Sequence, residues 1–271
     1  MTRPARSGRF PVVLELAQGT VARSVNSALL RPQRPLRQAA EDAARLASPS
    51  GLGLDSSAVR KRMVDRLRAD GVSNESVLQA FAAVERHRFV DTALATQAYE
   101  DTSLPIGLQQ TISKPSVVAR MLSLLFEGAH ARQHGNLGRV LEIGTGCGYQ
   151  AALLTRLAQG LVSIERIKPL HDKARLHLAA MRQGDVRLLH GDGRLGHAAR
   201  APYQSIVAAA GGDDLPEAWL QQLAVGGRLV APLHEASRGG QVLLVVDRRA
   251  DGLSQQRLDA VHFVPLRSGV E

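Results

Sequence analysis

From residue 139 onward, short apolar runs alternate with stretches in which apolar residues recur at helical spacing. The apolar runs predict strands at Arg139–Ile143, Leu161–Glu165, Val186–His190, Ser205–Ala209, Gly227–Pro232 and Val242–Val246. The helical stretches between them are Gln150–Ala158, Pro169–Met181 and Pro216–Leu223. Repeated alternation of strand and helix is typical of an α/β fold with a mostly parallel sheet and helices on both faces. Such a sheet binds ligands beyond the carboxyl ends of its strands.

The region before this alternation is predicted to be mainly helical. Apolar residues recur every three or four positions at 59–67, 77–84 and 118–125, which predicts three helices. Gly71 is expected to end the first helix, Ser73 or Asn74 to begin the second, and Pro115 to begin the third. The segment Tyr99–Lys114 contains a proline, a glycine and several polar residues, and it predicts a loop.

Residues 1–55 differ in composition, with five prolines, eight arginines, no lysine and four acidic residues. This composition predicts a flexible basic extension. The apolar run Phe10–Leu16 is too short for a secretory signal, whereas a transit peptide, or a start placed too far upstream, are alternative interpretations. We expect a folded domain at 56–271, with helices at 57–133, an α/β ligand-binding core at 138–250 and a strand region at 251–271.

The composition excludes several classes of protein. The net charge is +9 and only 3% of residues are aromatic; because about half of this charge lies in residues 1–55 and stacking rings are scarce, a specific nucleic-acid partner is not expected. The single cysteine, Cys147, excludes an intrachain disulfide and a cysteine-rich metal cage. No apolar run reaches the length of a membrane span. We therefore expect a cytoplasmic monomer without a metal or a membrane partner.

The strongest local signal is Val140–Tyr149, where an apolar strand ends in a loop with glycines at 144, 146 and 148. Glycines let the backbone turn sharply and approach a ligand closely. A dinucleotide-binding loop needs glycine at the position of Tyr149, and no Gly-Lys-Ser/Thr follows as in a P-loop. The loop therefore suits S-adenosylmethionine, a nucleoside with an amino-acid tail, while a plain strand-to-helix turn is the simpler alternative.

Two acidic residues lie at the ends of the next two predicted strands. Glu165 lies 21 residues after Gly144, where a carboxylate can accept hydrogen bonds from both ribose hydroxyls. Asp192 is placed to accept from an adenine amino group, although an Asp-Gly turn also explains it. His190 is expected to be a satisfied strand-end side chain. No Asn/Asp-Pro-Pro-Tyr/Phe segment follows the fourth strand, which argues against a DNA amino-methyltransferase.

Several separate segments resemble the protein-L-isoaspartate (D-aspartate) O-methyltransferase family, in its order and spacing. They are Leu104–Gly107, Gln110–Pro115, Val140–Tyr149, Ser163–Lys168, His190–Gly193, Gly226–Pro232 and Phe263–Leu266. Many methyltransferases share the glycine loop, whereas Thr-Ile-Ser ahead of it and the terminal Val-Pro-Leu are more specific. The resemblance implies a Rossmann-like S-adenosylmethionine-dependent methyltransferase domain at 56–271, with Phe263–Leu266 as its C-terminal strand.

The resemblance also implies roles for individual residues. Ser113 would be the active-site serine, with a cap on the helix after Pro115 as its other interpretation. The implied cofactor-binding residues are Gln110, Thr111, Ile112, Glu142, Gly144, Thr145, Gly146, Cys147, Gly148, Glu165, Arg166, Asp192 and Gly193. The implied substrate-binding residues are Pro105, Ile106, Thr111, Ile112, Ser113 and Val264. Among them, Thr111 and Ile112 would line the junction of cofactor and substrate. No metal ligand is implied.

Three departures from the family pattern bear on these expectations. Gly107-Leu108-Gln109-Gln110 replaces the more usual Gly-Gln-Gly-Gln/Ala, which alters the expected lip of the substrate site. Gln204 stands where an aspartate usually opens the fourth strand, and we expect it to affect only strand-end hydrogen bonding. Residues 1–55 have no counterpart in the short bacterial members.

The implied reaction moves a methyl group from S-adenosylmethionine to the free carboxylate of L-isoaspartyl residues in damaged proteins and peptides. It leaves S-adenosylhomocysteine and initiates repair, with D-aspartyl residues as an open second substrate. The carboxylate is anionic near neutral pH and needs no general base, so the protein must mainly align the reacting groups and exclude water. No Ser-His-Asp pattern surrounds Ser113, so it is not expected to be a hydrolase nucleophile. Two alternatives stay open: a methyltransferase acting on RNA or a small metabolite, and a non-enzymatic nucleic-acid-binding protein.

Overall fold

The computed structural model of the chain describes residues 57–179, 185–235 and 239–271. All of these residues belong to one unit of the chain, Pro49–Glu271. The flexible extension expected at residues 1–55 lies outside the described residues.

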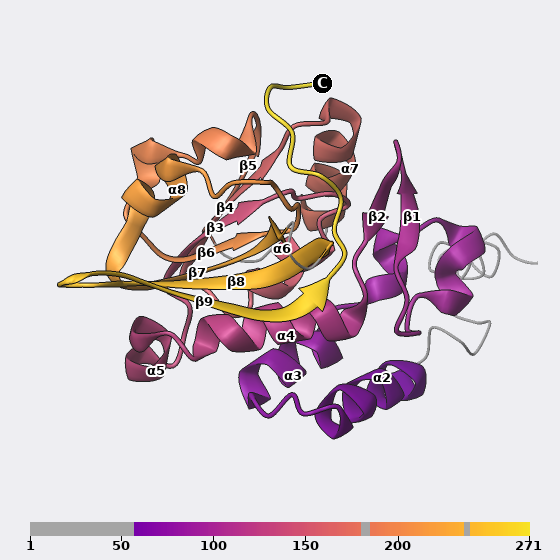
Figure 1. The fold of residues 1–271 in the computed structure, drawn as a ribbon. Coiled ribbons are helices and arrows are strands. Elements are labelled where there is room, and N and C mark those ends of the chain that lie inside the picture. Colours follow the sequence, from indigo (N-terminus) through magenta and orange to yellow (C-terminus); the bar gives the residue numbers. More distant parts are fainter. Residues whose placement is uncertain (1–56, 180–184, 236–238) are drawn as a thin grey trace, which may run out of the picture. The chain divides into compact units, whose positions relative to one another are not determined.

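Seven strands form the central sheet, in the order β5-β4-β3-β6-β7-β8-β9 (Figure 1). The first five strands in this order are parallel, and β8 and β9 are added antiparallel. The strand order reverses between β3 and β6, and ligands bind at such switch points. The strands are β3 (Arg139–Ile143), β4 (Gly160–Glu165), β5 (Asp185–His190), β6 (Tyr203–Ala208), β7 (Leu223–Glu235), β8 (Gly240–Arg249) and β9 (Gly252–Val261).

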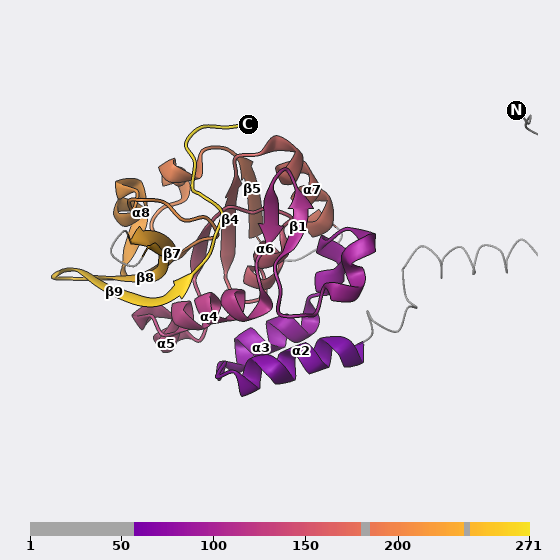
Figure 2. The same cartoon turned by 45° about the vertical axis from the view of Figure 1, so that its right-hand side comes forward.

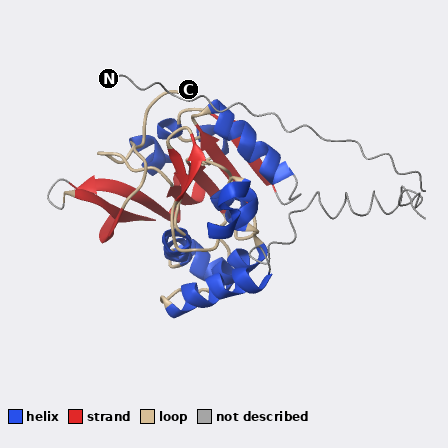
Figure 3. Cartoon of the chain, turned by 90° about the vertical axis from the view of Figure 1, so that its right-hand side faces the viewer, coloured by secondary structure: helices blue, strands red, loops and turns tan. Residues whose placement is uncertain are grey.

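Helices cover both faces of this sheet, and each face has its own apolar core. Val140 and Leu161 pack with α4 (Pro115–Phe126), α6 (Tyr149–Leu154) and α7 (Lys168–Ala179) on one face. Leu141 and Val162 pack with α8 (Glu217–Gln222) on the other. Successive side chains of a strand point to opposite faces, so buried central strands read as continuous apolar runs. Figure 3 shows the helices beside the strands. The arrangement confirms the predicted α/β class.

The three predicted N-terminal helices are present as α2, α3 and α4, and Asn74 caps α3 by accepting from the amide of Val77 at 3.1 Å. The short α5 and the 3-10 helices η2 and η3 were not predicted, because each has only a few residues and no apolar period. The helices are α2 (Ser57–Ala69), α3 (Glu75–Ala83), η2 (Arg86–Phe89), η3 (Thr92–Gln97), α4 (Pro115–Phe126), α5 (Ala129–His134), α6 (Tyr149–Leu154), α7 (Lys168–Ala179), η4 (Gly193–Leu195), η5 (Ala198–Arg200) and α8 (Glu217–Gln222).

The loop expected at Tyr99–Lys114 is wrong in part, because a small hairpin lies within it (Figure 2). Its strands, β1 (Leu104–Gly107) and β2 (Gln110–Ile112), form a separate antiparallel pair. Leu108 and Gln109 make the turn with φ of 52° and 58°, a region that non-glycine residues seldom adopt. Strands of only three or four residues, one of which contains a proline, are too short for alternating apolar and polar positions to predict them.

The C-terminal strand expected at Phe263–Leu266 is also wrong. The last strand is β9, which ends at Val261, and the later segment contributes an isolated bridge between Gly211 and Pro265. Strand β9 lies at the edge of the sheet and is largely exposed, so its polar sequence gives no strand signal. No helix in the described ranges is long and apolar enough to cross a membrane.

Candidate active site

A cavity of about 660 Å³ lies at the carboxyl ends of β3 and β4. Its lining residues include the β1–β2 hairpin, the glycine loop after β3, the end of β4 and residues 264–267, together with Gly193, Ala209 and Glu271. The carboxyl ends of neighbouring parallel strands meet at one edge of a sheet, so the loops that follow them share one pocket. The predicted site residues that line it are Ile106, Gln110, Thr111, Ile112, Ser113, Gly144, Thr145, Gly146, Cys147, Glu165, Arg166, Gly193 and Val264.

Four predicted site residues do not line the cavity. Pro105 is exposed on β1, and Glu142 is fully buried under the glycine loop. Gly148 precedes α6, where a Cβ would lie 3.2 Å from that of Ala174 in α7. Asp192 is adjacent to the lining residue Gly193.

The end of β4 holds the glycine loop in place. The amide of Gly144 donates to the carbonyl of Ile164, and the amide of Gly146 donates to Oε2 of Glu165, both at 2.8 Å. The other oxygen of Glu165 accepts from the amide of Ile167 at 2.9 Å. Three loop glycines have φ of 86°, 56° and 92°, which glycine adopts without steric cost. The loop and the acid are therefore joined by direct hydrogen bonds.

A buried polar chain lies under the same loop. The Ser163 hydroxyl donates to Oε2 of Glu142 at 2.5 Å and is 2.6 Å from Oγ1 of Thr145. Burial raises the pKa of Glu142 to about 8, against the lowering effect of Ser163 and Gln150. The Gln150 amide nitrogen and Oε1 of Glu142 are both buried without a well-formed hydrogen bond among the described residues, and Gln150 lies close enough to favour the charged form of Glu142. Gln150 also lines the cavity.

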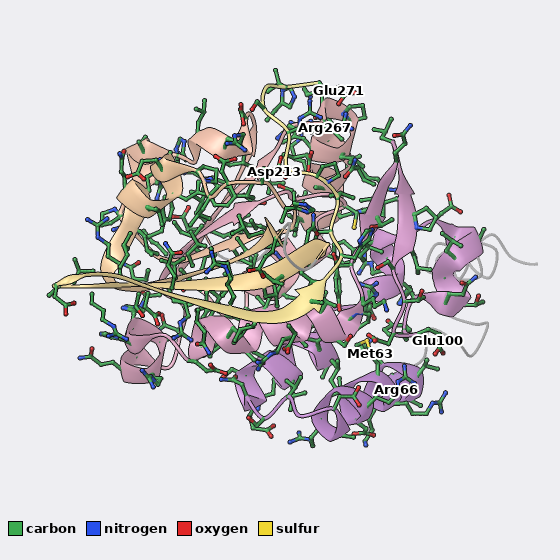
Figure 4. The ribbon with its side chains drawn as sticks, viewed as in Figure 1. Met63, Arg66, Glu100, Asp213, Arg267 and Glu271 are labelled. Carbon is green, nitrogen blue, oxygen red and sulfur yellow. The ribbon has the colours of Figure 1, made fainter. Side chains whose placement is uncertain are left out.

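The C-terminal segment contacts the residues that follow β4 and β5. Oδ2 of Asp192 accepts from the amide of Gly269 at 2.6 Å, and Oδ1 accepts from the amide of Arg194 at 2.8 Å. Arg166 forms a 2.7 Å ion pair with Glu271, which also lines the cavity. Figure 4 labels Glu271 at the C-terminal end of the chain. His190 is 3.1 Å from the carbonyl of Arg166, as expected of a satisfied side chain. Both oxygens of Asp192 thus have main-chain partners here.

Ser113 follows β2 directly, is half-buried and lines the cavity. It does not cap the helix after it, because Lys114 occupies the N-cap of α4 and no side chain at that position bonds the helix. Asp101 accepts instead from the amide and the hydroxyl of Ser116, at 2.8 and 2.7 Å. The capping interpretation of Ser113 is therefore wrong, and its hydroxyl has no hydrogen-bond partner among the described residues.

Leu108 and Gln109, which the sequence marked as a departure at the expected lip of the substrate site, line the cavity from the hairpin turn. Other lining residues were not predicted: Ala209 follows β6, and Glu271 lies at the far end of the chain. Gln150 comes just after the glycine loop, and this position was the one sequence signal that it lies near the cavity. The others could be found only from the way distant segments fold together.

The parallel sheet, the glycine loop and the strand-end acid together define a Rossmann-like, S-adenosylmethionine-dependent methyltransferase. The family model of protein-L-isoaspartate(D-aspartate) O-methyltransferase matches residues 58–271, and the chain belongs to this family. A protein-L-isoaspartate O-methyltransferase of Methylibium petroleiphilum is 58% identical over 270 residues, which cover 99% of this chain and 98% of that protein. One of Leptothrix cholodnii is 58% identical over 276 residues, covering 99% and 96%.

Solved structures agree with this fold. A protein-L-isoaspartate O-methyltransferase superposes with a TM-score of 0.69 at 25% identity, over 78% of this chain and 67% of the other. A Plasmodium falciparum structure, described as a putative protein-L-isoaspartate O-methyltransferase in complex with S-adenosyl-L-homocysteine, has a TM-score of 0.63 at 21% identity, over 77% and 98%.

Proposed function

We propose that this chain transfers a methyl group from S-adenosylmethionine to the free carboxylate of L-isoaspartyl residues in proteins and peptides, and so initiates their repair. The observation that carries the proposal is that the glycine loop and the segment Gln110–Ser113 line one cavity. Membership of the family over residues 58–271 supports the same reaction. D-Aspartyl residues are the second substrate that the family description includes.

The cavity fits the cofactor in size and in chemistry. Its volume of about 660 Å³ falls within the range of small-molecule sites. Each oxygen of Glu165 accepts one amide, and a carboxylate oxygen has a second lone pair that a ribose hydroxyl can use. We assign the glycine loop to the amino-acid tail. Asp192, Gly193 and Arg166 are assigned to the adenine end.

The chain's own residues mainly position the reacting groups. When bound, S-adenosylmethionine supplies a methyl group on a positively charged sulfur. A new bond from the substrate carboxylate oxygen to the methyl carbon forms as the carbon–sulfur bond breaks, its electron pair stays on sulfur, and no proton moves. Ser113 donates a hydrogen bond that orients the carboxylate, while Ile112 and Val264 exclude water from the line of attack.

The isoaspartyl linkage moves one methylene from the side chain into the backbone, so the free carboxylate lies closer to the main chain. A rigid site can separate the two isomers by position, since a misplacement of about 1 Å can cost on the order of a hundredfold in rate. We also propose that the enzyme acts as a cytoplasmic monomer, which agrees with Cys147 being buried and unpaired.

The test is labelled-methyl transfer to a matched pair of peptides that differ only in L-isoaspartate or L-aspartate at one position. We expect methylation of the isoaspartyl peptide and little of the other. Equal rates on both peptides, or no transfer to either while the cofactor binds, would refute the proposal. Transfer to RNA or to a small metabolite under the same conditions would establish the alternative methyltransferase function.

A further inference from the structure

Arg86 is fully buried at the start of η2 and has no carboxylate partner among the described residues. Burying a charged group costs free energy unless hydrogen bonds replace its water. Burial lowers the pKa of Arg86, but a guanidinium remains charged at physiological pH. Without an ion pair, the cost of burying Arg86 must be offset by its hydrogen bonds.

The acceptors of Arg86 are main-chain carbonyl oxygens at both ends of the β1–β2 hairpin. Nη2 donates to the carbonyl of Thr102 at 3.3 Å, just before β1, and to that of Ser113 at 2.9 Å, just after β2. Nε donates to the carbonyl of Ala98 at 2.7 Å. One guanidinium thus joins the two ends of the hairpin that walls the cavity, and one of these ends is Ser113.

The same guanidinium also contacts the cofactor side of the site. Its central carbon is 4.8 Å from the centre of the Tyr149 ring, which is within the range of a cation–π contact. Tyr149 begins α6 directly after the glycine loop. Arg86 therefore lies between the substrate hairpin and the helix of the cofactor loop.

We propose that Arg86 is a positioning residue for methyl transfer, which fixes the main chain at Ser113 and so directs the Ser113 hydroxyl toward the substrate carboxylate. This inference rests on the proposed function. A planar guanidinium can donate to several carbonyls at fixed angles, whereas a lysine ammonium is a single point donor on a flexible stem. A lysine at position 86, which keeps only the positive charge, should therefore not restore the function of Arg86.

The first test is Arg86→Lys in the full chain. We expect kcat on the isoaspartyl peptide to fall on the order of 10- to 100-fold. The dissociation constant of S-adenosylmethionine should change less than about threefold, because Ile164 and Glu165 hold the glycine loop independently. Arg88→Lys is the matched control in the same η2 turn, where the side chain is exposed and paired with Glu85; it should leave both values unchanged.

The second test is a double-mutant cycle with Ser113→Ala. If Arg86 acts through Ser113, the double variant should lose little more kcat than Ser113→Ala alone. A merely structural role would make the two losses multiply, and that result, or an unchanged kcat in Arg86→Lys, would overturn the proposal. Arg86→Gln serves as the second variant because it carries no charge to bury. Failure of both variants to fold would make Arg86 a stability residue and likewise overturn the proposal.

Hydrogen exchange separates this inference from the proposed function. In Arg86→Lys, the amides of residues 104–113 should exchange at least about tenfold faster than in the wild type. Unchanged exchange would show that the Arg86 hydrogen bonds do not hold the hairpin in place. If the wild type binds S-adenosylmethionine but does not methylate the isoaspartyl peptide, the proposed function fails. The exchange result still decides whether Arg86 orders the hairpin.

Discussion

At the residue scale, the buried carboxylate of Glu142 makes stability depend on pH. The folded state raises its pKa to about 8 from an ordinary value of 4.5. Between these values the native protein holds a proton that the unfolded chain has released, so the contribution of this group is full below pH 4.5 and is lost as pH rises toward 8. Glutamine has nearly the shape of the protonated acid and does not titrate.

We predict that Glu142→Gln gains stability relative to the wild type as pH rises. The difference in unfolding free energy between the two proteins should shift by on the order of 3 kcal/mol between pH 5 and pH 8. Urea denaturation without cofactor at the two pH values measures it. Asp251→Asn is the control because Asp251 is exposed. Parallel pH profiles for Glu142→Gln and the wild type would show that the buried acid is charged throughout.

Residues of the site differ in how far sequence could predict them. A local pattern marks the glycines at 144, 146 and 148, which come after the apolar strand β3, and Glu165, which ends the apolar strand β4. Arg86 lies in the polar run Glu85–Arg88, which is typical of a solvent-exposed segment. Its burial depends on residues 98–113 folding over it, and the sequence of η2 alone does not predict that contact.

At the element scale, the start of α4 is held by a residue from outside the helix. Asp101 accepts from the amide and the hydroxyl of Ser116, and the N-cap residue itself supplies no side-chain bond. A carboxylate near a helix N-terminus is also favoured by the helix dipole. This contact joins the segment before β1 to the helix after β2, so it supports the hairpin as well as α4.

We predict that Asp101→Ala lowers the unfolding free energy by about 1 kcal/mol, as the loss of a helix cap does. Asp101→Asn keeps an acceptor and should lose less than half as much. Denaturant titration of the two variants measures the difference. Equal losses would mean that charge, and not the cap, stabilises this end of the helix.

The elements predicted with least success are those whose pairing is non-local. Strands β3 to β8 carry apolar runs long enough to be recognised; the bounds of β3 match the prediction, whereas one or both ends of the others differ from it. The strands β1, β2 and β9 are short, polar or exposed, and each exists because a partner strand satisfies its backbone. Local composition cannot report a partner that lies elsewhere in the chain.

At the scale of the whole molecule, the described cavity is lined by residues between Ile106 and Glu271. The family model begins at residue 58. The relatives from Methylibium petroleiphilum and Leptothrix cholodnii align with 99% of this chain, and so also with residues before 58. We propose on this basis that residues 1–55 are an extension that catalysis does not require, and that residues 56–271 form the catalytic domain.

We predict that a chain beginning at residue 56 keeps kcat/KM on the isoaspartyl peptide within about twofold of the full chain. Steady-state methyl transfer by both proteins is the measurement, and circular dichroism checks that the shorter chain folds. A folded short chain with much lower activity would place part of residues 1–55 in the site.

The sequence by itself determined the class of fold and the glycine loop, because apolar periodicity, glycines after a strand and an acid at a strand end are local features of the sequence. Only the tertiary structure decided that Ser113 lies at the end of a hairpin and not at a helix cap. It also decided that Asp192 bonds the C-terminal segment and that a buried Arg86 joins both ends of the hairpin. These depend on contacts between residues far apart in the chain, which form only when the core brings their segments together.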